Sequence, residues 1–222
     1  VKANGGKFPI NDDAKGAGAV FVPPDTTDFT PYLNQILDSG ADVLIVTWSG
    51  AGFVPMFQQM QQLGIFKEMA VATGMGDNQT LAKGYADAIN SVGVVVYHYS
   101  LFDTPENKYL TDEHIKRFNT PPDLWAEAGF NCAMMVKEAV EATKGDTTGD
   151  ALIKVLEGMK FKGPKGDYEV RASDHALLQP MTLVKLLNTT DPDFKFFELV
   201  TRFEPAETAP PCLVPAEQGR CK

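Results

Sequence analysis

The sequence predicts an α/β protein built on a parallel β-sheet, and the evidence lies mainly in its first hundred residues. Residues 43–46, 69–73 and 92–99 are short apolar runs with β-branched side chains, which is typical of buried strands. Between these runs, residues 52–63 and 79–89 carry apolar side chains at helical spacing. The connections are short enough for right-handed crossovers, in which each helix links two parallel strands.

Two further elements precede this alternating region. Residues 19–22 have the composition of a short strand. Thr30 and Pro31 then predict the start of a helix, because a hydroxyl side chain caps the first turn and proline fits the first helical position. Gly40 ends this helix. We expect the strand at 43–46 to be buried on both faces of the sheet, as the central strands of parallel sheets are.

From residue 101 to residue 175 the sequence is mostly helical, with almost no sheet of its own. Amphipathic patterns predict three helices, at 106–118, 123–144 and 151–156. A turn-rich connector at 161–166 and an exposed strand at 168–171 follow, and then two strands at 181–187 and 194–203 that a hairpin loop joins. We expect Trp125 to face the core from the longest helix. Because amphipathic helices need a surface to cover, they pack either on the first sheet or on a sheet outside this sequence.

The chain has three cysteines. Cys212 and Cys221 close a short loop in which Pro215 and Gly219 suit a turn, so we predict a disulfide bond between them. Such a bond is typical of an oxidising compartment such as a bacterial periplasm, and the alternative is two free thiols in the tail. We expect Cys132, inside an apolar helix, to be a small buried core residue and not a nucleophile.

The ends of the predicted strands carry residues suited to contact a small ligand. Ligands of open α/β sheets bind outside the carboxyl ends of the strands, where glycines allow close approach to the backbone. Glycine, hydroxyl or aromatic residues follow three predicted strands here, at Trp48, Ser49, Gly50, Ala51, Gly74, Met75 and Tyr99. The alternative for Trp48 is ordinary core packing beside a strand-to-helix turn.

Several function classes are excluded by the sequence. The formal net charge is -9 and no stretch is basic, which argues against nucleic acid or an anionic membrane as a partner. His98, His114 and His175 lack the spacing of metal ligands, and no phosphate-binding loop is present. Asp174 beside His175 is more consistent with a structural role than with catalysis. We therefore expect no enzyme activity, no metal and no cofactor.

Short sequences along nearly the whole chain carry a family resemblance. They are Pro-Asp-Thr-Thr-Asp-Phe-Thr-Pro-Tyr-Leu at 24–33, Ala-Asp-Val-Leu-Ile-Val at 41–46, Gln-Leu-Gly-Ile at 62–65, Pro-Pro-Asp at 121–123, Gly-Pro-Lys-Gly at 163–166 and Arg-Ala-Ser-Asp-His at 171–175. In this order they resemble the type I periplasmic solute-binding proteins of ABC transporters, of the branched-chain amino-acid-binding type. The resemblance implies a periplasmic receptor that delivers a small carboxylate, an amino acid or an aromatic acid, to an ABC transporter permease. The alternative is the ligand-sensing domain of a signalling or regulatory protein.

The resemblance also implies an architecture of two Rossmann-like lobes joined by three crossing strands. Residues 1–100 and 176–222 would form the C-terminal ligand-binding lobe, a three-layer unit around a parallel sheet. Residues 101–175 would be the returning segment of an incomplete N-terminal lobe. The sheet of that lobe has no counterpart here and the chain begins at Val1, so we expect a missing N-terminal segment of the same protein to be a partner.

By the same resemblance, the ligand contacts would be the residues at the strand ends together with Phe102 in the crossover. The aromatic rings of Trp48, Tyr99 and Phe102 suit a planar or apolar ligand, because rings stack favourably on rings. The N-termini of the helices behind the turns suit a carboxylate. The sequence therefore predicts a bulky apolar or aromatic carboxylate as the ligand.

Overall fold

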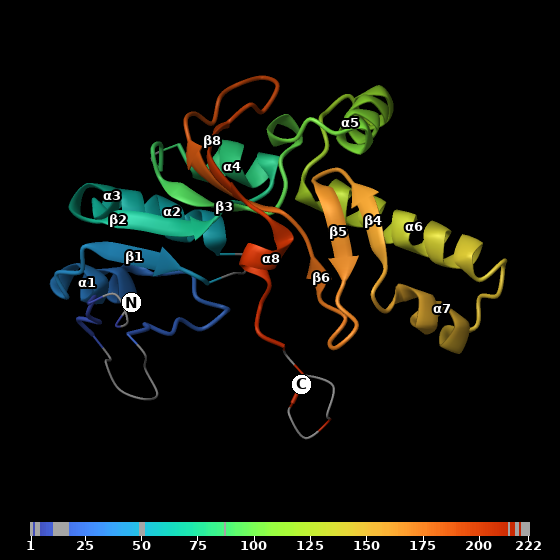
Figure 1. Cartoon of the computed structure of the whole chain (residues 1–222). Helices are drawn as coiled ribbons and strands as arrows, with labels where there is room; N and C mark the ends of the chain where they lie inside the picture. The colour runs from blue at the N-terminus through green and yellow to red at the C-terminus, as the bar shows by residue number, and fades with distance from the viewer. Residues whose placement is uncertain are drawn as a thin grey trace. The chain divides into compact units, whose positions relative to one another are not determined.

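The computed structural model describes residues 2, 5–10, 18–48, 52–86, 88–212, 214–215 and 218 of the chain. The elements of the first half, in chain order, are α1 (Thr30–Asp38), β1 (Val43–Val46), α2 (Phe53–Gln62), α3 (Ile65–Glu68), β2 (Ala70–Gly74), α4 (Asn78–Gly84), β3 (Val92–Val95) and the 3-10 turn η2 (Tyr99–Leu101) (Figure 1). The second half contains α5 (Pro105–Phe118), α6 (Leu124–Ala142), α7 (Gly149–Leu156), β4 (Lys160–Gly163), β5 (Gly166–Val170), β6 (Leu177–Leu178), β7 (Met181–Leu186), β8 (Phe197–Phe203) and α8 (Pro205–Thr208). None of the helices among the described residues is long and apolar enough to cross a membrane.

The chain divides into two compact units. Unit 1 contains Val1–Val94 and Val184–Glu198, and unit 2 contains Val95–Leu183 and Leu199–Lys222. Strands β3, β7 and β8 each begin in one unit and end in the other, so the chain passes between the units three times. The assignment of residues 1–100 with 176–222, and of 101–175, to two lobes of a binding protein stays a prediction.

The main sheet confirms the predicted α/β class. Its strand order is β1-β2-β3-β7-β8, and β1 pairs with β2, and β2 with β3, in parallel. Val43 lies opposite Ala70, and Ala72 lies opposite Val92, which aligns the carboxyl ends of the three strands at one edge. Helices link these strands in sequence, as the alternating apolar runs predicted.

One face of the parallel part of the sheet is covered by helices. Val71 and Thr73 of β2 are buried on that face, where α3 packs against β2 and α2 packs against α3 and α4. Phe57 of α2 is fully buried and stacks on Tyr85 with ring centroids 4.5 Å apart. The stripe of Phe and Met side chains on α2 is therefore core packing.

Two expectations for this region are wrong. Residues 19–22 form no strand, and β1 is the edge strand of the sheet. The Val22 carbonyl accepts a hydrogen bond from the Trp48 indole instead of pairing within the sheet. Strand β1 is not buried on both faces, since Val43 is 55% and Ile45 is 61% exposed. Apolar composition predicted the strand correctly but does not say what covers it.

Unit 2 contains a small sheet of which the sequence predicted only the strand at 168–171, which overlaps β5. Strands β4, β5 and β6 pair in that order and antiparallel, and β4 falls in the stretch expected to be a turn-rich connector. The long helix α6 lies close to its predicted bounds, and Asp123 caps it by accepting hydrogen bonds from the Trp125 and Ala126 amides. Its inward face, however, is different from the expected one.

The predictions for Trp125 and Cys132 are both wrong. Trp125 is 69% exposed and Cys132 is exposed, whereas the buried side chains of α6 include Glu127 and Asn131. The helix turns these two polar residues inward because Tyr168 of β5 donates a hydrogen bond to Glu127 at 2.5 Å, and Asn131 donates another. A buried polar network thus sets the orientation of α6.

Candidate functional site

Trp48 lies at the carboxyl end of β1, where the sequence predicted a ligand contact. It is half-buried within unit 1, and its indole Nε1 donates a hydrogen bond to the Val22 carbonyl at 3.2 Å. Phe29 packs against the indole edge-to-face, with centroids 5.2 Å apart. These contacts fix the ring at the strand end, and only its remaining surface is left for a ligand.

The turn after β2 would offer a ligand its backbone more than its side chains. A Cβ atom at Gly74 would meet no atom within 4 Å, so space is open at this position. Met75 is buried, and its amide donates to the Val94 carbonyl at 2.8 Å, which ties the turn to β3. Open space at Gly74 suits close approach of a ligand, whereas Met75 belongs mostly to the core.

The two helices that follow these turns differ at their N-termini. Helix α2 begins after Gly52 without a side-chain cap or an acidic residue in its first turn, and its first amides have no partner within the helix. Helix α4 is capped by Asp77, whose carboxylate accepts from the Thr80 amide at 2.9 Å and from the Thr80 hydroxyl. A ligand carboxylate would be attracted to the N-terminus of α2 and repelled at that of α4.

Tyr99 and Phe102 belong to unit 2. Tyr99 is half-buried, and its ring lies on His98 with centroids 4.9 Å apart. Phe102 is buried, stacks on Tyr97 and has the guanidinium of Arg202 over its ring at 5.8 Å. Phe102 thus has a packing role in unit 2, and its ligand contact stays a prediction.

Some predicted site residues lie outside the described part of the chain. These are Ser49, Gly50 and Ala51, which connect β1 to α2, and Cys221 near the C-terminus. Cys132 is a free thiol, and the sulfur of Cys212 lies 3.7 Å from the Ser173 hydroxyl. Because Cys221 is not described, the pairing of Cys212 with Cys221 stays a prediction.

A buried lysine in unit 2 was missed by the sequence reasoning. Lys165 is 0% exposed, and its Nζ donates to the Val96 carbonyl at 2.8 Å. Burial lowers the pKa of Lys165 to about 8, and the negative charge of Glu127 partly opposes this. The same burial, with the Glu127 charge, raises the pKa of Tyr168. Lys165 stands between Pro164 and Gly166, in the stretch that the sequence predicted as a turn-rich connector.

The hydrogen bonds of Lys165 also hold two segments at which the chain enters unit 2, one after β3 and one in β8. The Lys165 carbonyl accepts from Arg202 at 3.1 Å, and Arg202 follows the unit boundary within β8. Val96 directly follows β3, which crosses the boundary between Val94 and Val95. Lys165 therefore fixes two crossing segments to the turn between β4 and β5.

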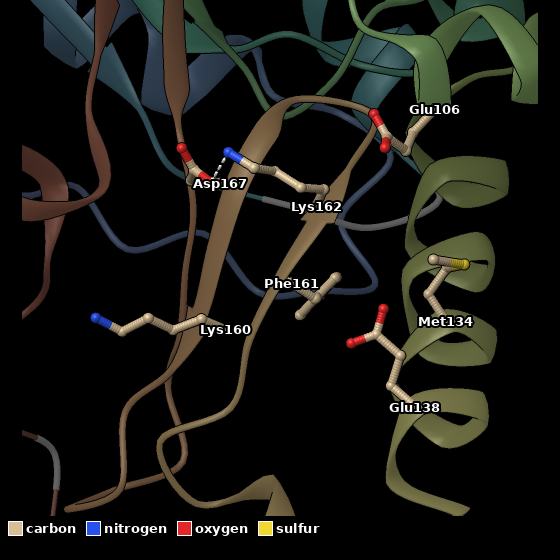
Figure 2. Close-up of a pocket in the computed structure, with 7 residues that line it drawn as sticks. All are labelled: Glu106, Met134, Glu138, Lys160, Phe161, Lys162 and Asp167. Carbon is tan, nitrogen blue, oxygen red and sulfur yellow. Dashed lines mark hydrogen bonds and ion pairs between the residues drawn. The ribbon is translucent and has the colours of Figure 1, made fainter. Parts of the chain in front are cut away.

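Unit 2 carries a groove of about 400 Å³ between α6 and β4, shown in Figure 2. It is lined by charged and apolar side chains, namely Glu106, Met134, Glu138, Lys160, Phe161, Lys162 and Asp167. Lys162 pairs with Asp167, and Lys160 pairs with Glu169 at 3.2 Å. Since both ammonium groups are already paired with carboxylates, this groove offers a poor site for a ligand carboxylate.

The described residues offer no metal site. No group of three or more His, Cys, Asp or Glu side chains among them could hold a metal ion. His98 is buried with its Nδ1 2.9 Å from the Ser100 hydroxyl, and His175 lies 2.8 Å from a Glu157 carboxylate oxygen. Asp174, predicted to have a structural role, forms a two-point ion pair with Arg171 at 2.6 and 2.7 Å.

Comparison with protein families gives a match that covers most of the chain. Residues 3–191 match the family described as "Periplasmic binding protein". A Leu/Ile/Val-binding protein homolog of Brucella melitensis is 23% identical over 188 residues, which are 82% of this chain and 48% of that protein. The chain thus spans about half the length of the curated relatives that it matches.

Solved structures give the same result. The crystal structure of an ABC-type branched-chain amino acid transporter protein from Rhodopseudomonas palustris CGA009 is 33% identical, with a TM-score of 0.72, over 85% of this chain and 51% of that one. A solute-binding protein from Rhodopseudomonas palustris BisB5, in complex with 3,4-dihydroxybenzoic acid, is 24% identical with a TM-score of 0.69, over 83% of this chain and 51% of that one.

Proposed function

Because this chain belongs to the periplasmic binding protein family, we propose that it forms part of an extracytoplasmic receptor that delivers a small carboxylate to an ABC importer. The family match over residues 3–191 is the observation that carries the proposal. The 33% identical structure is described as part of an ABC-type branched-chain amino acid transporter, which supports a transport role. The partner of the loaded receptor would be the permease of that importer.

The ligand carboxylate would lie at the N-terminus of α2. Gly52 leaves this terminus uncapped, and the amides of Phe53 and Val54 are the donors because Pro55 has no N–H. Ser49, Gly50 and Ala51 lead into this terminus and would surround the carboxylate.

The body of the ligand would meet aromatic and open backbone surfaces. In unit 1 these are the uncovered surface of Trp48 and the open position at Gly74 with the neighbouring Met75. By the family resemblance, Tyr99 and Phe102 of unit 2 would also contact the ligand. These residues favour an amino acid with a large apolar side chain or an aromatic acid. The bound 3,4-dihydroxybenzoic acid in the BisB5 protein supports the view that this fold accommodates an aromatic carboxylate.

The remaining assignments follow from this role. Unit 1 would correspond to most of the ligand-binding lobe, and the strands shared with unit 2 would be the crossings at which the receptor hinges. The predicted disulfide between Cys212 and Cys221 would agree with a periplasmic location, because disulfides persist in oxidising compartments.

A thermal-shift screen tests the proposed function. Since the chain spans about half of its relatives' length, the sample is a family-length polypeptide that contains this chain, screened with amino acids and hydroxybenzoates. A ligand at about 100 times its Kd stabilises the folded state by about 2.7 kcal/mol. For a protein of the relatives' length, about twice that of the matched region, that corresponds to a rise in Tm of about 3 °C. If no carboxylate raises Tm, the proposed ligand class is wrong.

A further inference from the structure

Helix α5 places a buried polar side chain beside the segment that follows β3 in unit 2. Asn107 is only 4% exposed, and two residues that it contacts, Tyr97 and Phe102, form an apolar cluster with Leu110. A buried carboxamide needs hydrogen-bond partners, because leaving one unpaired costs free energy. The Asn107 Nδ2 donates to the Tyr99 carbonyl at 2.8 Å and to the Phe102 carbonyl at 2.6 Å. Its Oδ1 accepts from the Tyr97 hydroxyl at 2.7 Å.

The two carbonyls that Asn107 contacts lie at the two ends of the turn η2. Tyr99 is the first residue of this turn and Phe102 directly follows its last. Within the turn, the Leu101 amide donates to the His98 carbonyl at 3.1 Å. Backbone carbonyls only accept hydrogen bonds, so these partners determine that the carboxamide turns its NH2 group toward them. One side chain of α5 thus holds both ends of η2.

This arrangement differs from ordinary capping of a helix. Thr104 caps α5 by accepting from the Asn107 amide at 3.0 Å, which makes Asn107 the third residue of the helix. A polar side chain at this position commonly reaches back to the amide of the capping residue. The Asn107 side chain instead bonds residues that precede the helix. The Thr104 hydroxyl donates to the Pro164 carbonyl at 2.9 Å, so the start of α5 is itself fixed to the turn between β4 and β5.

We propose that Asn107 is a positioning residue of the ligand-binding site, which keeps Tyr99 and Phe102 in the conformation that contacts the ligand. The inference rests on the proposed function, because Tyr99 and Phe102 are ligand contacts only within it. Asn107 acts through the backbone of η2 and does not touch the ligand itself. The competing explanation is that Asn107 contributes only to the stability of unit 2.

A positioning role predicts an effect on affinity. A turn that is already in its bound conformation does not have to be ordered when the ligand binds. Asn107→Leu nearly keeps the shape of the side chain but removes its hydrogen bonds to the two carbonyls. The apparent Kd is the intrinsic Kd divided by the fraction of molecules in the binding-competent conformation. A turn that holds this conformation for about one tenth of the time therefore binds about ten times more weakly.

Two measurements on a family-length polypeptide that contains this chain test the proposal. Isothermal titration gives the Kd for 3,4-dihydroxybenzoate and for L-leucine, and hydrogen–deuterium exchange of the unliganded protein reports opening of η2. The matched control is Asn131→Leu, the same substitution at a residue of unit 2 that is 3% exposed and donates to Glu127. Asn107→Ala, which leaves room for water at the carbonyls, is a second variant with the same expectations if Asn107→Leu does not fold.

Asn107→Leu is expected to raise the Kd of the probe that binds the wild type at least about tenfold. It should also speed exchange of the Leu101 amide at least about tenfold. Asn131→Leu should lower Tm without changing either quantity.

Three results overturn the positioning role while the proposed function stands. The first is an unchanged Kd in Asn107→Leu, whatever its Tm. The second is an equal loss of affinity in Asn131→Leu, because destabilisation alone would then explain it. The third is a weaker Kd without faster exchange in η2. If the wild type binds neither probe and no other carboxylate raises its Tm, the proposed function fails and the positioning role fails with it.

Discussion

Lys165 gives the sharpest test of the buried polar network in unit 2. Its ammonium group is fully buried and donates to the Val96 carbonyl, and burial lowers its pKa from 10.5 to about 8. Lys165→Met keeps an unbranched side chain but removes the titrating group. The difference in unfolding free energy between the two proteins should therefore depend on pH.

The sign follows from the proton count. Below pH 8, Lys165 is protonated in both the folded and the unfolded chain. Between about pH 8 and 10.5 only the unfolded chain keeps the proton, so the folded state gains stability as pH rises. The drop from 10.5 to about 8 corresponds to about 3 kcal/mol. The unfolding free energy of the wild type should thus rise by about 3 kcal/mol relative to Lys165→Met between pH 7 and pH 10.5.

Urea denaturation at several pH values, followed by circular dichroism, measures this difference. The matched control is Lys162→Met, because Lys162 lies nearby on β4 but is exposed and pairs with Asp167 at the surface. That variant should stay within about 1 kcal/mol of the wild type at every pH. A difference between wild type and Lys165→Met that does not change with pH would refute a buried, charged Lys165.

Three further predictions concern Asp123, Gly93 and Trp48. Asp123→Ala removes the acceptor for two amides at the start of α6 and should lower the unfolding free energy by about 1 kcal/mol, measured by urea denaturation; an unchanged midpoint would contradict this. Gly93→Ala would place a Cβ atom 2.3 Å from the Thr73 carbonyl oxygen and should lower the unfolding free energy by about 2 kcal/mol or more. The control, Gly149→Ala, adds a Cβ atom in open space and should be neutral or stabilising. Equal Tm values for the two variants would show that β3 can accommodate a side chain at position 93. Trp48→Ala should weaken binding of an aromatic carboxylate about tenfold in calorimetry of a family-length protein, and unchanged affinity would remove Trp48 from the proposed site.

The parallel sheet could be predicted because local sequence determines it. Residues 43–46 and 92–95 are apolar and β-branched, and glycines or helix signals bound them, so propensity and packing agree. The exposure of Val43 and Ile45 could not be predicted in the same way. Burial depends on what lies above a strand, and the composition of the strand itself carries no information about that.

The predicted orientation of α6 was wrong for a different reason. The helix carries apolar or small residues on nearly every side, so no single stripe indicates the core. Glu127 is buried because Tyr168, 41 positions later in the chain, donates to it. Such a long-range partner has no local signal, and the exposed Trp125 and Cys132 follow from the rotation that this contact imposes.

The candidate site was predictable only in its position. Trp48 and Gly74 lie at the strand ends as expected, since parallel strands bring their carboxyl ends to one edge. The difference between α2 and α4 was not foreseen. It depends on whether the residue before each helix caps it, and only the hydrogen bond from Thr80 to Asp77 shows that α4 is capped.

Isothermal titration of a family-length protein with the carboxylates that raise its Tm tests the proposed receptor function most directly. The account predicts saturable binding with one ligand per protein, and no chemical change in the ligand recovered afterwards. A ligand that is converted to a product would contradict a receptor role. The absence of saturable binding for every amino acid and aromatic acid tested would contradict the proposal that this chain contributes to a carboxylate-binding receptor.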